Sequence, residues 1–341
     1  MFQKMNTKRW IALGVAILII GLSSISTGIS GLVNREAQTQ RLEEELNKLT
    51  QFQGLTRATL EGSDSDNQIA VLRVDGAIMS GTSVPFGSAS YDHSAFLAQL
   101  KDIGSDDSVK AILLQVNSPG GGVYESAEIH RALEELKEAG ITIYSSFETM
   151  AASGGYYISA GSDKIYATPS TLTGSIGVII ASMNVSGLME KLGIQDQVVK
   201  SGVNKDIFSS NRPITEEERA IMQGLVDDMY GEFLNVVSTG RNMPMETLRP
   251  LADGRIYSGN QALQNGLVDE IGYPDDALAA LKETLDSEDP LVYEYSVNPM
   301  GNFFSYFYSK GGAGELEALK SILISGYDQG ARPLYLYGGE S

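Results

Sequence analysis

The residues best suited to chemistry lie in the octapeptide Met150-Ala-Ala-Ser153-Gly-Gly-Tyr-Tyr157. Ser153 follows the β-rich run Ile141–Phe147 and has only small neighbours, which predicts a tight turn from a strand into a short helix. Such a turn presents a hydroxyl as a nucleophile and leaves backbone N–H groups close by to stabilise an oxyanion. The alternative is a packing site at which small residues let a helix approach a sheet. The octapeptide alone is compatible with both.

A second glycine-rich stretch, Asn117-Ser-Pro-Gly120-Gly-Gly122, lies between a predicted strand and a predicted helix. A phosphate-binding loop is disfavoured, because no Gly-Lys-Ser/Thr follows and no GxGxxG pattern is present. Two interpretations remain. The proline and glycines can direct bare N–H groups into the space above the sheet as an oxyanion hole, or they can form a tight turn that caps the helix.

A nucleophile at Ser153 needs a base, and the chain offers few candidates. It has no cysteine, which excludes disulfides, thiolate catalysis and Cys-ligated zinc, and its only histidines are His93 and His130. If neither histidine serves, a lysine kept neutral by burial is the remaining general base. The candidates beyond Ser153 are Lys164, Lys191, Lys200 and Lys205. Lys205 lies in a polar, glycine-containing segment rather than on an evident exposed helical face.

Apolar runs of strand length alternate with amphipathic segments from Gln68 to about Asp286, which predicts one α/β domain with a mostly parallel sheet flanked by helices. Strands are expected at Ile69–Val74, Val109–Val116, Ile141–Phe147, Lys164–Ala167, Ser175–Ile180 and Gln197–Lys200. Helices are expected at Ser94–Ile103, Val123–Gly140, Gly154–Gly161, Ser186–Leu192, Thr215–Ser238 and Pro274–Leu285. The net charge of −18 argues against nucleic-acid binding, which needs clustered Lys and Arg.

The N-terminal residues predict a membrane anchor. Residues 1–9 include Lys4, Lys8 and Arg9, and residues 10–33 form an uncharged apolar run long enough to cross a bilayer as a helix. The basic flank predicts a cytoplasmic N-terminus and an exported remainder. A cleaved secretory signal is the alternative, and it also exports the domain. Residues 34–67 then form a polar stalk, 68–286 the α/β domain, and 287–341 a C-terminal extension with an apolar tail.

Five motifs in this order resemble the signal peptide peptidase A family of membrane-bound serine proteases, in its short, single-domain form. The motifs are Asn117-Ser-Pro-Gly-Gly-Gly122, Tyr124-Glu-Ser-Ala, Met150–Tyr157, Leu172-Thr-Gly-Ser-Ile-Gly-Val178 and Ser201-Gly-x-x-Lys-Asp206. The resemblance implies a crotonase-like or Clp-protease-like α/β fold. It implies that Ser153 is the nucleophile and Lys205 the general base, that Gly120 and Gly154 supply oxyanion-hole N–H groups, and that Ser175 orients the lysine amine.

The same resemblance implies a membrane-anchored serine endopeptidase that degrades remnant signal peptides, which are apolar. It implies a homo-oligomeric ring in which neighbouring subunits complete each site, with no cofactor and no metal. The alternatives are a protease of the same fold that acts on other membrane proteins or regulatory peptides, and a non-enzymatic, ring-forming membrane scaffold. The tail Leu334-Tyr-Leu-Tyr337 is apolar at an exposed terminus, and we expect it to occupy an active-site groove.

Overall fold

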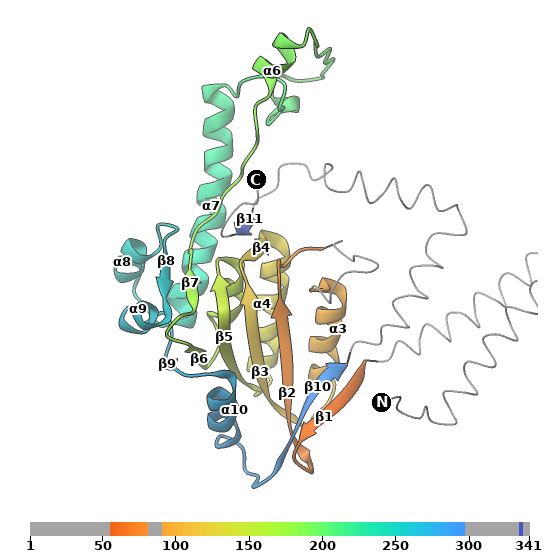
Figure 1. Cartoon of the computed structure of the whole chain (residues 1–341), viewed down its shortest axis with the longest axis vertical. Helices are drawn as coiled ribbons and strands as arrows, with labels where there is room; N and C mark the ends of the chain where they lie inside the picture. Colours follow the sequence, from red (N-terminus) through yellow and green to blue (C-terminus); the bar gives the residue numbers. More distant parts are fainter. Residues whose placement is uncertain (1–54, 81–90, 297–333, 337–341) are drawn as a thin grey trace, which may run out of the picture. The chain divides into compact units, whose positions relative to one another are not determined.

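The computed structural model describes residues 55–80, 91–296 and 334–336. At its centre is a nine-stranded sheet in the order β1-β10-β2-β3-β5-β6-β9, with β7 paired to β5 and β8 to β7 (Figure 1). All neighbours on the path from β10 to β9 are parallel, whereas β1 runs antiparallel to β10 and β8 to β7. The strands are β1 (Thr56–Glu61), β2 (Asp64–Asp75), β3 (Val109–Ser118), β5 (Thr142–Ala152), β6 (Lys164–Ala167), β7 (Leu172–Gly174), β8 (Ile256–Ser258), β9 (Glu270–Ile271) and β10 (Pro290–Ser296). A separate two-stranded pair joins β4 (Gly120–Gly122) to β11 (Leu334–Leu336).

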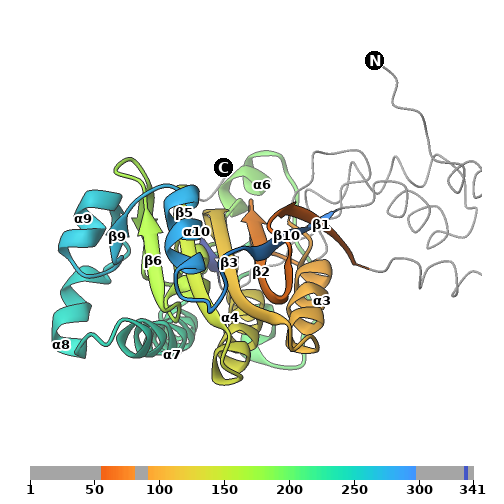
Figure 2. The same ribbon diagram turned by 90° about the horizontal axis from the view of Figure 1, so that it is seen from below.

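Helices lie on both faces of the sheet, as Figure 2 shows from below. The helices are α3 (His93–Gly104), α4 (Val123–Glu138), α5 (Gly154–Ser159), α6 (Ser186–Lys191), η2 (Val203–Asp206), α7 (Glu216–Gly240), α8 (Met245–Leu248), η3 (Arg249–Leu251), α9 (Gly259–Gln264) and α10 (Pro274–Lys282). The mixed α/β architecture with a mostly parallel sheet, predicted from the alternating pattern, is confirmed.

The alternation of side chains along β3 explains why both faces are covered. Ile112 and Leu114 pack into the larger core cluster with α3, α4, α5 and α7, whereas Ala111 and Leu113 pack into a second cluster with α10. Successive residues of a strand point to opposite faces, so an apolar run with no polar interruption requires cover on each side. These two cores hold the carboxyl ends of β3 and β5, where the glycine-rich stretches lie.

Two strands lie outside the predicted 68–286 domain. β1 falls within the segment predicted as a stalk, and β10 within the predicted C-terminal extension. β10 pairs with β2 on one side and with β1 on the other. The polar composition of β1 resembles that of a linker because β1 is an edge strand whose side chains are mostly exposed. The sheet in the described part of the chain therefore spans Thr56 to Ser296.

An arm projects from the domain beyond the carboxyl ends of the strands (Figure 1). It consists of residues 175–215 and the first half of α7, with α6 and η2 at its far end, which we call the arm head. The strands predicted at Ser175–Ile180 and Gln197–Lys200 are absent, and α6 and η2 are separated by irregular backbone. An apolar β-branched run becomes a strand only where a partner strand is available, and Val199 is instead fully exposed.

The predicted membrane helix at residues 10–33 lies outside the described residues, as does most of the predicted stalk. Of the helices in the described part of the chain, none combines the length and the hydropathy needed to cross a bilayer.

Candidate active site

Ser153 stands at a strained turn between β5 and α5. It is the N-cap of α5 with φ 54° and ψ −116°, a conformation that costs a non-glycine residue about 1–3 kcal/mol and is common at functional sites. Its N–H donates to the Gly174 carbonyl at 2.8 Å, and its own carbonyl accepts from Tyr157 N at 2.8 Å. In the described part of the chain the Ser153 hydroxyl makes no hydrogen bond. The strand, tight turn and short helix predicted around Ser153 are therefore observed.

Gly120 and Gly154, the two residues expected to supply oxyanion-hole N–H groups, are in contact. A Cβ on Gly120, whose φ is +98°, would lie 2.5 Å from Gly154 N. A Cβ on Gly154 would lie 3.1 Å from Gly120 Cα and 2.6 Å from Ser126 Oγ. Any side chain at either position would force these backbones apart, so both glycines are required by close approach.

The N–H groups of Gly120 and Gly154 differ in their hydrogen bonding. Gly120 N donates to Ser118 Oγ at 3.1 Å, so this N–H already has a partner. Gly154 N is the first amide of α5, where amides have no intrahelical partner and carry the positive end of the helix dipole. Gly154 is therefore the better prepared of the two donors for an oxyanion.

Ser175 lies next to the nucleophilic turn. It follows Gly174, the residue whose carbonyl accepts from Ser153 N, and its own N–H donates to Arg255 O at 2.8 Å. Its φ is 50° and its exposed fraction is 7 %. The strained backbone of Ser175 is held between β7 and β8, which fixes it beside Ser153.

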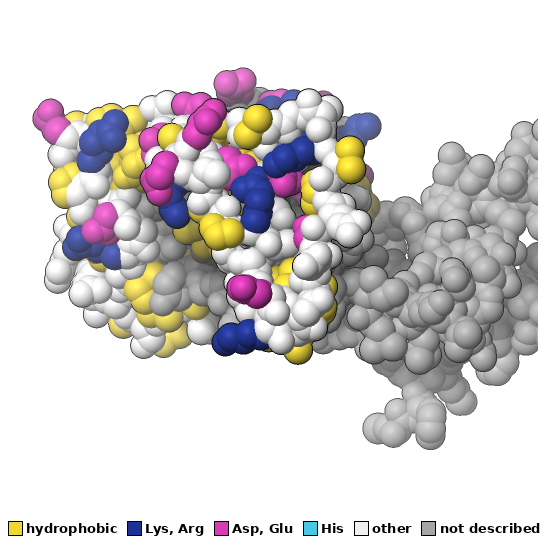
Figure 3. All heavy atoms as spheres, turned by 90° about the horizontal axis from the view of Figure 1, so that it is seen from above, with side chains coloured by type: hydrophobic (Ala, Val, Ile, Leu, Met, Phe, Trp, Pro, Cys, Tyr) yellow, Lys and Arg dark blue, Asp and Glu magenta, His cyan; other side chains and the backbone are white. Residues whose placement is uncertain are grey.

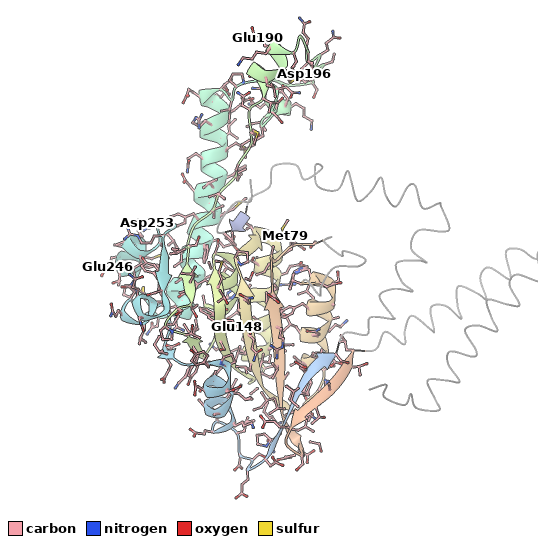
Figure 4. The ribbon with its side chains drawn as sticks, viewed as in Figure 1. Met79, Glu148, Glu190, Asp196, Glu246 and Asp253 are labelled. Atoms are coloured by element: carbon pink, nitrogen blue, oxygen red, sulfur yellow. The ribbon has the colours of Figure 1, made fainter. Side chains whose placement is uncertain are left out.

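Lys205 is not brought to Ser153 within one chain. It is an exposed residue of η2 in the arm head, and its side chain contacts no partner in the described part of the chain. Figure 4 labels Glu190 and Asp196 in this head, at the tip of the arm, and Glu148, a residue of β5, within the sheet. Ser153, Gly120, Gly154 and Ser175 thus assemble in one chain, whereas Lys205 stays apart.

The other candidate bases are less suitable. His130 is largely buried, burial lowers its pKa to about 4, and its ring lies edge-on to Tyr157 with centroids 5.3 Å apart. His93 is bonded on both ring nitrogens, to the Tyr91 hydroxyl at 2.6 Å and the Glu128 carboxylate at 3.0 Å.

Two of the candidate lysines are paired with carboxylates. Lys164 pairs with Glu270 at 3.2 Å, and this hydrogen bond raises the pKa of Lys164, which opposes a neutral amine. Lys200 pairs with Asp206. Lys191 is exposed at the end of α6.

The C-terminal strand β11 reaches the same site. It pairs antiparallel with β4, with Tyr335 opposite Gly121. The Tyr335 carbonyl oxygen lies close to Gly120, because a Cβ on Gly120 would be 1.9 Å from it. A peptide strand therefore lies along the glycine turn, with a carbonyl beside the Gly120–Gly154 contact.

The Tyr335 side chain fills an aromatic pocket that the sequence did not reveal. It is fully buried, stacks on Tyr157 with centroids 4.9 Å apart, and contacts the Phe233 ring at 4.6 Å. Its hydroxyl donates to the Met229 carbonyl at 3.1 Å. Tyr157 could have been suspected from the octapeptide, whereas Phe233 and Met229 come from α7 and carry no local signal.

The arm displays apolar side chains at its surface. Met183, Leu192 and Val203 are 75 %, 66 % and 77 % exposed, respectively. The space-filling view from above shows hydrophobic patches beside Lys, Arg, Asp and Glu side chains on this face (Figure 3). A cavity of about 230 Å³ in the arm head is lined by Met189, Glu190 and Ile194, among others.

Comparisons with known proteins identify the family of the chain. Residues 135–288 match the model of Peptidase family S49, and residues 65–176 match that of Clp protease. An Enterococcus faecium protein named for signal peptide peptidase SppA is 47 % identical over 98 % of this chain and 100 % of its own length. Protease 4 of Haemophilus influenzae is 35 % identical over 70 % of this chain and 38 % of its own. The chloroplastic serine protease SPPA of Arabidopsis thaliana is 30 % identical over 68 % of this chain and 34 % of its own. The chain is a serine peptidase and belongs to Peptidase family S49.

Proposed function

We propose that this serine peptidase is a membrane-anchored endopeptidase with a Ser153/Lys205 dyad, and that it degrades remnant signal peptides. The observation that carries the dyad is the nucleophilic turn at Ser153, beside two glycines in contact and with a peptide strand lying along them. The chemistry follows from these positions and from the lysine on the arm.

The reaction begins with a neutral Lys205 amine that takes the proton of the Ser153 hydroxyl. The serine oxygen attacks the substrate carbonyl, and the Gly154 and Gly120 N–H groups hold the resulting oxyanion. The protonated lysine then gives its proton to the leaving amine as the peptide bond breaks. A water molecule, deprotonated by the same lysine, hydrolyses the acyl-enzyme and frees Ser153. Ser175, next to the nucleophilic turn, orients the amine.

The lysine of a neighbouring subunit completes each site. α7 runs from the arm head to the domain, where Phe233 contacts Tyr157 at 5.0 Å. At 1.5 Å per residue, Glu216 and Phe233 are about 26 Å apart along the helix, far more than a lysine side chain spans. The exposed apolar residues of the arm suit contact with a second copy of the chain. A head-to-tail contact of this kind repeats and closes into a homo-oligomeric ring.

The substrate binds as a strand antiparallel to β4, as β11 does. The pocket of Tyr157 and Phe233 accepts a large apolar or aromatic side chain. Apolar signal-peptide remnants present such side chains in quantity. The apolar run at residues 10–33 would hold the exported domain near the bilayer in which these remnants lie.

We further propose that the tail, as an occupant of the substrate position, restrains activity. It competes with peptide for β4 and for the aromatic pocket. Because the tail belongs to the same chain, its effective concentration at the site is high.

The proposal is tested with the full chain in detergent micelles and an apolar fluorogenic peptide. Ser153→Ala and Lys205→Ala should each abolish turnover, whereas Lys191→Ala, which removes another exposed lysine of the arm head, should leave it unchanged. Light scattering should show the same oligomer for all three variants. Turnover that persists in Ser153→Ala would exclude this serine, and turnover that persists in Lys205→Ala would exclude the lysine as base.

A further inference from the structure

Four charged side chains form a compact cluster at the base of the Lys205 segment. The Arg212 guanidinium binds both oxygens of Asp206, at 2.7 Å and 3.0 Å, and also both oxygens of Glu218. The Lys200 ammonium pairs with the same Asp206 carboxylate. We call Lys200, Asp206, Arg212 and Glu218 the Arg212 cluster. Two positive and two negative groups meet in it, so the cluster as a whole is neutral.

The cluster ties η2 to the beginning of α7. Glu218 is the third residue of that helix, its side chain is 2 % exposed, and it forms a capping box with Thr215. Asp206 is the last residue of η2. Planar guanidinium–carboxylate pairs of this kind fix distance and orientation together. Arg212 therefore fixes the position and orientation of η2 relative to α7.

Lys205 immediately precedes Asp206 but points elsewhere. In a 3₁₀ helix consecutive residues are turned by about a third of a circle, so adjacent side chains diverge. Asp206 faces Arg212, whereas Lys205 is exposed and binds no group in the described part of the chain. Another acid of the arm head, Asp196, accepts a hydrogen bond from Asn211 at 2.8 Å and is not part of the cluster.

We propose that Arg212 is a positioning residue for the general base: it fixes the Lys205 segment to α7 and engages the Asp206 carboxylate, so that this charge does not hold the Lys205 amine in its protonated form. The inference rests on the proposed role of Lys205. A free carboxylate close to an amine stabilises the ammonium form, which cannot accept the Ser153 proton. The arginine also lowers the pKa of Asp206 well below its usual range and the pKa of Glu218 to about 2, so both carboxylates stay ionised and bonded near neutral pH.

The test is the pH dependence of kcat/KM for an apolar fluorogenic peptide, measured on the full chain in micelles. Arg212→Gln leaves Asp206 with one positive partner instead of two. The acidic limb of the profile should move to higher pH by about one unit, which lowers activity near neutral pH about tenfold and spares the alkaline plateau. The matched control is Arg219→Gln, because Arg219 is an exposed arginine of α7 whose carboxylate contact, to Glu216, is 3.9 Å long. This control should leave the profile unchanged.

Asp206→Asn provides the opposite change. It removes the negative charge and leaves two positive groups beside the lysine, so the acidic limb should move to lower pH. In the double variant Arg212→Gln/Asp206→Asn the limb should return close to its original position. If Arg212→Gln does not fold, the direction in which Asp206→Asn moves the acidic limb of the pH profile still tests the proposal.

Two results would overturn the inference: a loss of activity in Arg212→Gln by the same factor at every pH, or an upward shift of the limb in Asp206→Asn. Either would make the cluster purely structural. Failure of the proposed dyad is seen separately, as undiminished turnover in Lys205→Ala.

Discussion

Truncating Tyr335 to alanine should release the tail and raise the turnover of added peptide. The Tyr335 side chain is fully buried between Tyr157 and Phe233, and its hydroxyl donates to Met229 O. Burial of a large apolar side chain stabilises by about 1.5–3 kcal/mol. Each aromatic pair adds about 0.5–1.5 kcal/mol.

The alanine variant should therefore weaken docking by roughly 2.5–6 kcal/mol, which is about 70- to 25,000-fold in the docking constant. The rise in kcat/KM equals the loss in docking until the tail is fully released, and then it stops. Deletion of residues 332–341 sets this upper limit. The assay is turnover of a short apolar fluorogenic peptide by the full chain in micelles, at concentrations well below KM.

Two controls separate tail release from a general effect. Tyr335→Phe keeps both ring contacts and loses only the hydrogen bond to Met229 O, so the rise should be at most about tenfold. Tyr273→Ala removes a 63 % exposed tyrosine elsewhere and should change nothing. If Tyr335→Ala and the deletion both turn over peptide at the wild-type rate, the docked strand does not compete with substrate and the reasoning is wrong.

Three further predictions concern the glycine contact, the pocket and a buried histidine. Gly154→Ala should lower kcat by about 10²–10³, because its Cβ would lie 2.6 Å from Ser126 Oγ and displace an oxyanion donor; single-turnover kinetics with the oligomer intact would check this. In the chain that lacks residues 332–341, Phe233→Ala should raise KM for peptides with an aromatic residue about tenfold while a glycine-substituted peptide is unaffected, and equal effects on both would contradict the pocket. Burial lowers the pKa of His130 to about 4 from 6.5, so unfolding takes up a proton between these values and stability should fall by up to about 3 kcal/mol as pH drops through that window. Urea unfolding at pH 7 and 4.5 measures this, and the pH dependence should diminish in His130→Gln.

The local sequence pattern was sufficient to predict a helix or strand where a single chain segment determines its structure. The helix predicted at Ser94–Ile103 is observed at His93–Gly104, and the strand predicted at Lys164–Ala167 has those bounds. Gly120 and Gly154 were named from the family resemblance as oxyanion-hole donors, and the structure places them in contact. Both glycine-rich stretches follow neighbouring parallel strands, whose carboxyl ends meet at one edge of a sheet.

The features that were missed depend on distant partners. The polar strand β1 forms by pairing with β10, which lies more than 200 residues away in the sequence. Its own composition does not indicate a strand. The Gln197–Lys200 run has strand composition but no strand partner in the described part of the chain, and Val199 is left fully exposed. The pocket of Tyr335 joins α5, α7 and the C-terminal tail, and no spacing in the sequence connects them.

We propose above all that Lys205 of one subunit is the general base for Ser153 of its neighbour. The most direct test is to co-express Ser153→Ala and Lys205→Ala chains and to measure peptide turnover by the purified mixed oligomer. Each variant alone should be inactive. In random head-to-tail assembly about a quarter of the sites combine an intact serine with an intact lysine, so turnover should recover to about a quarter of the wild-type value. Mixed oligomers that form and remain inactive would contradict the account.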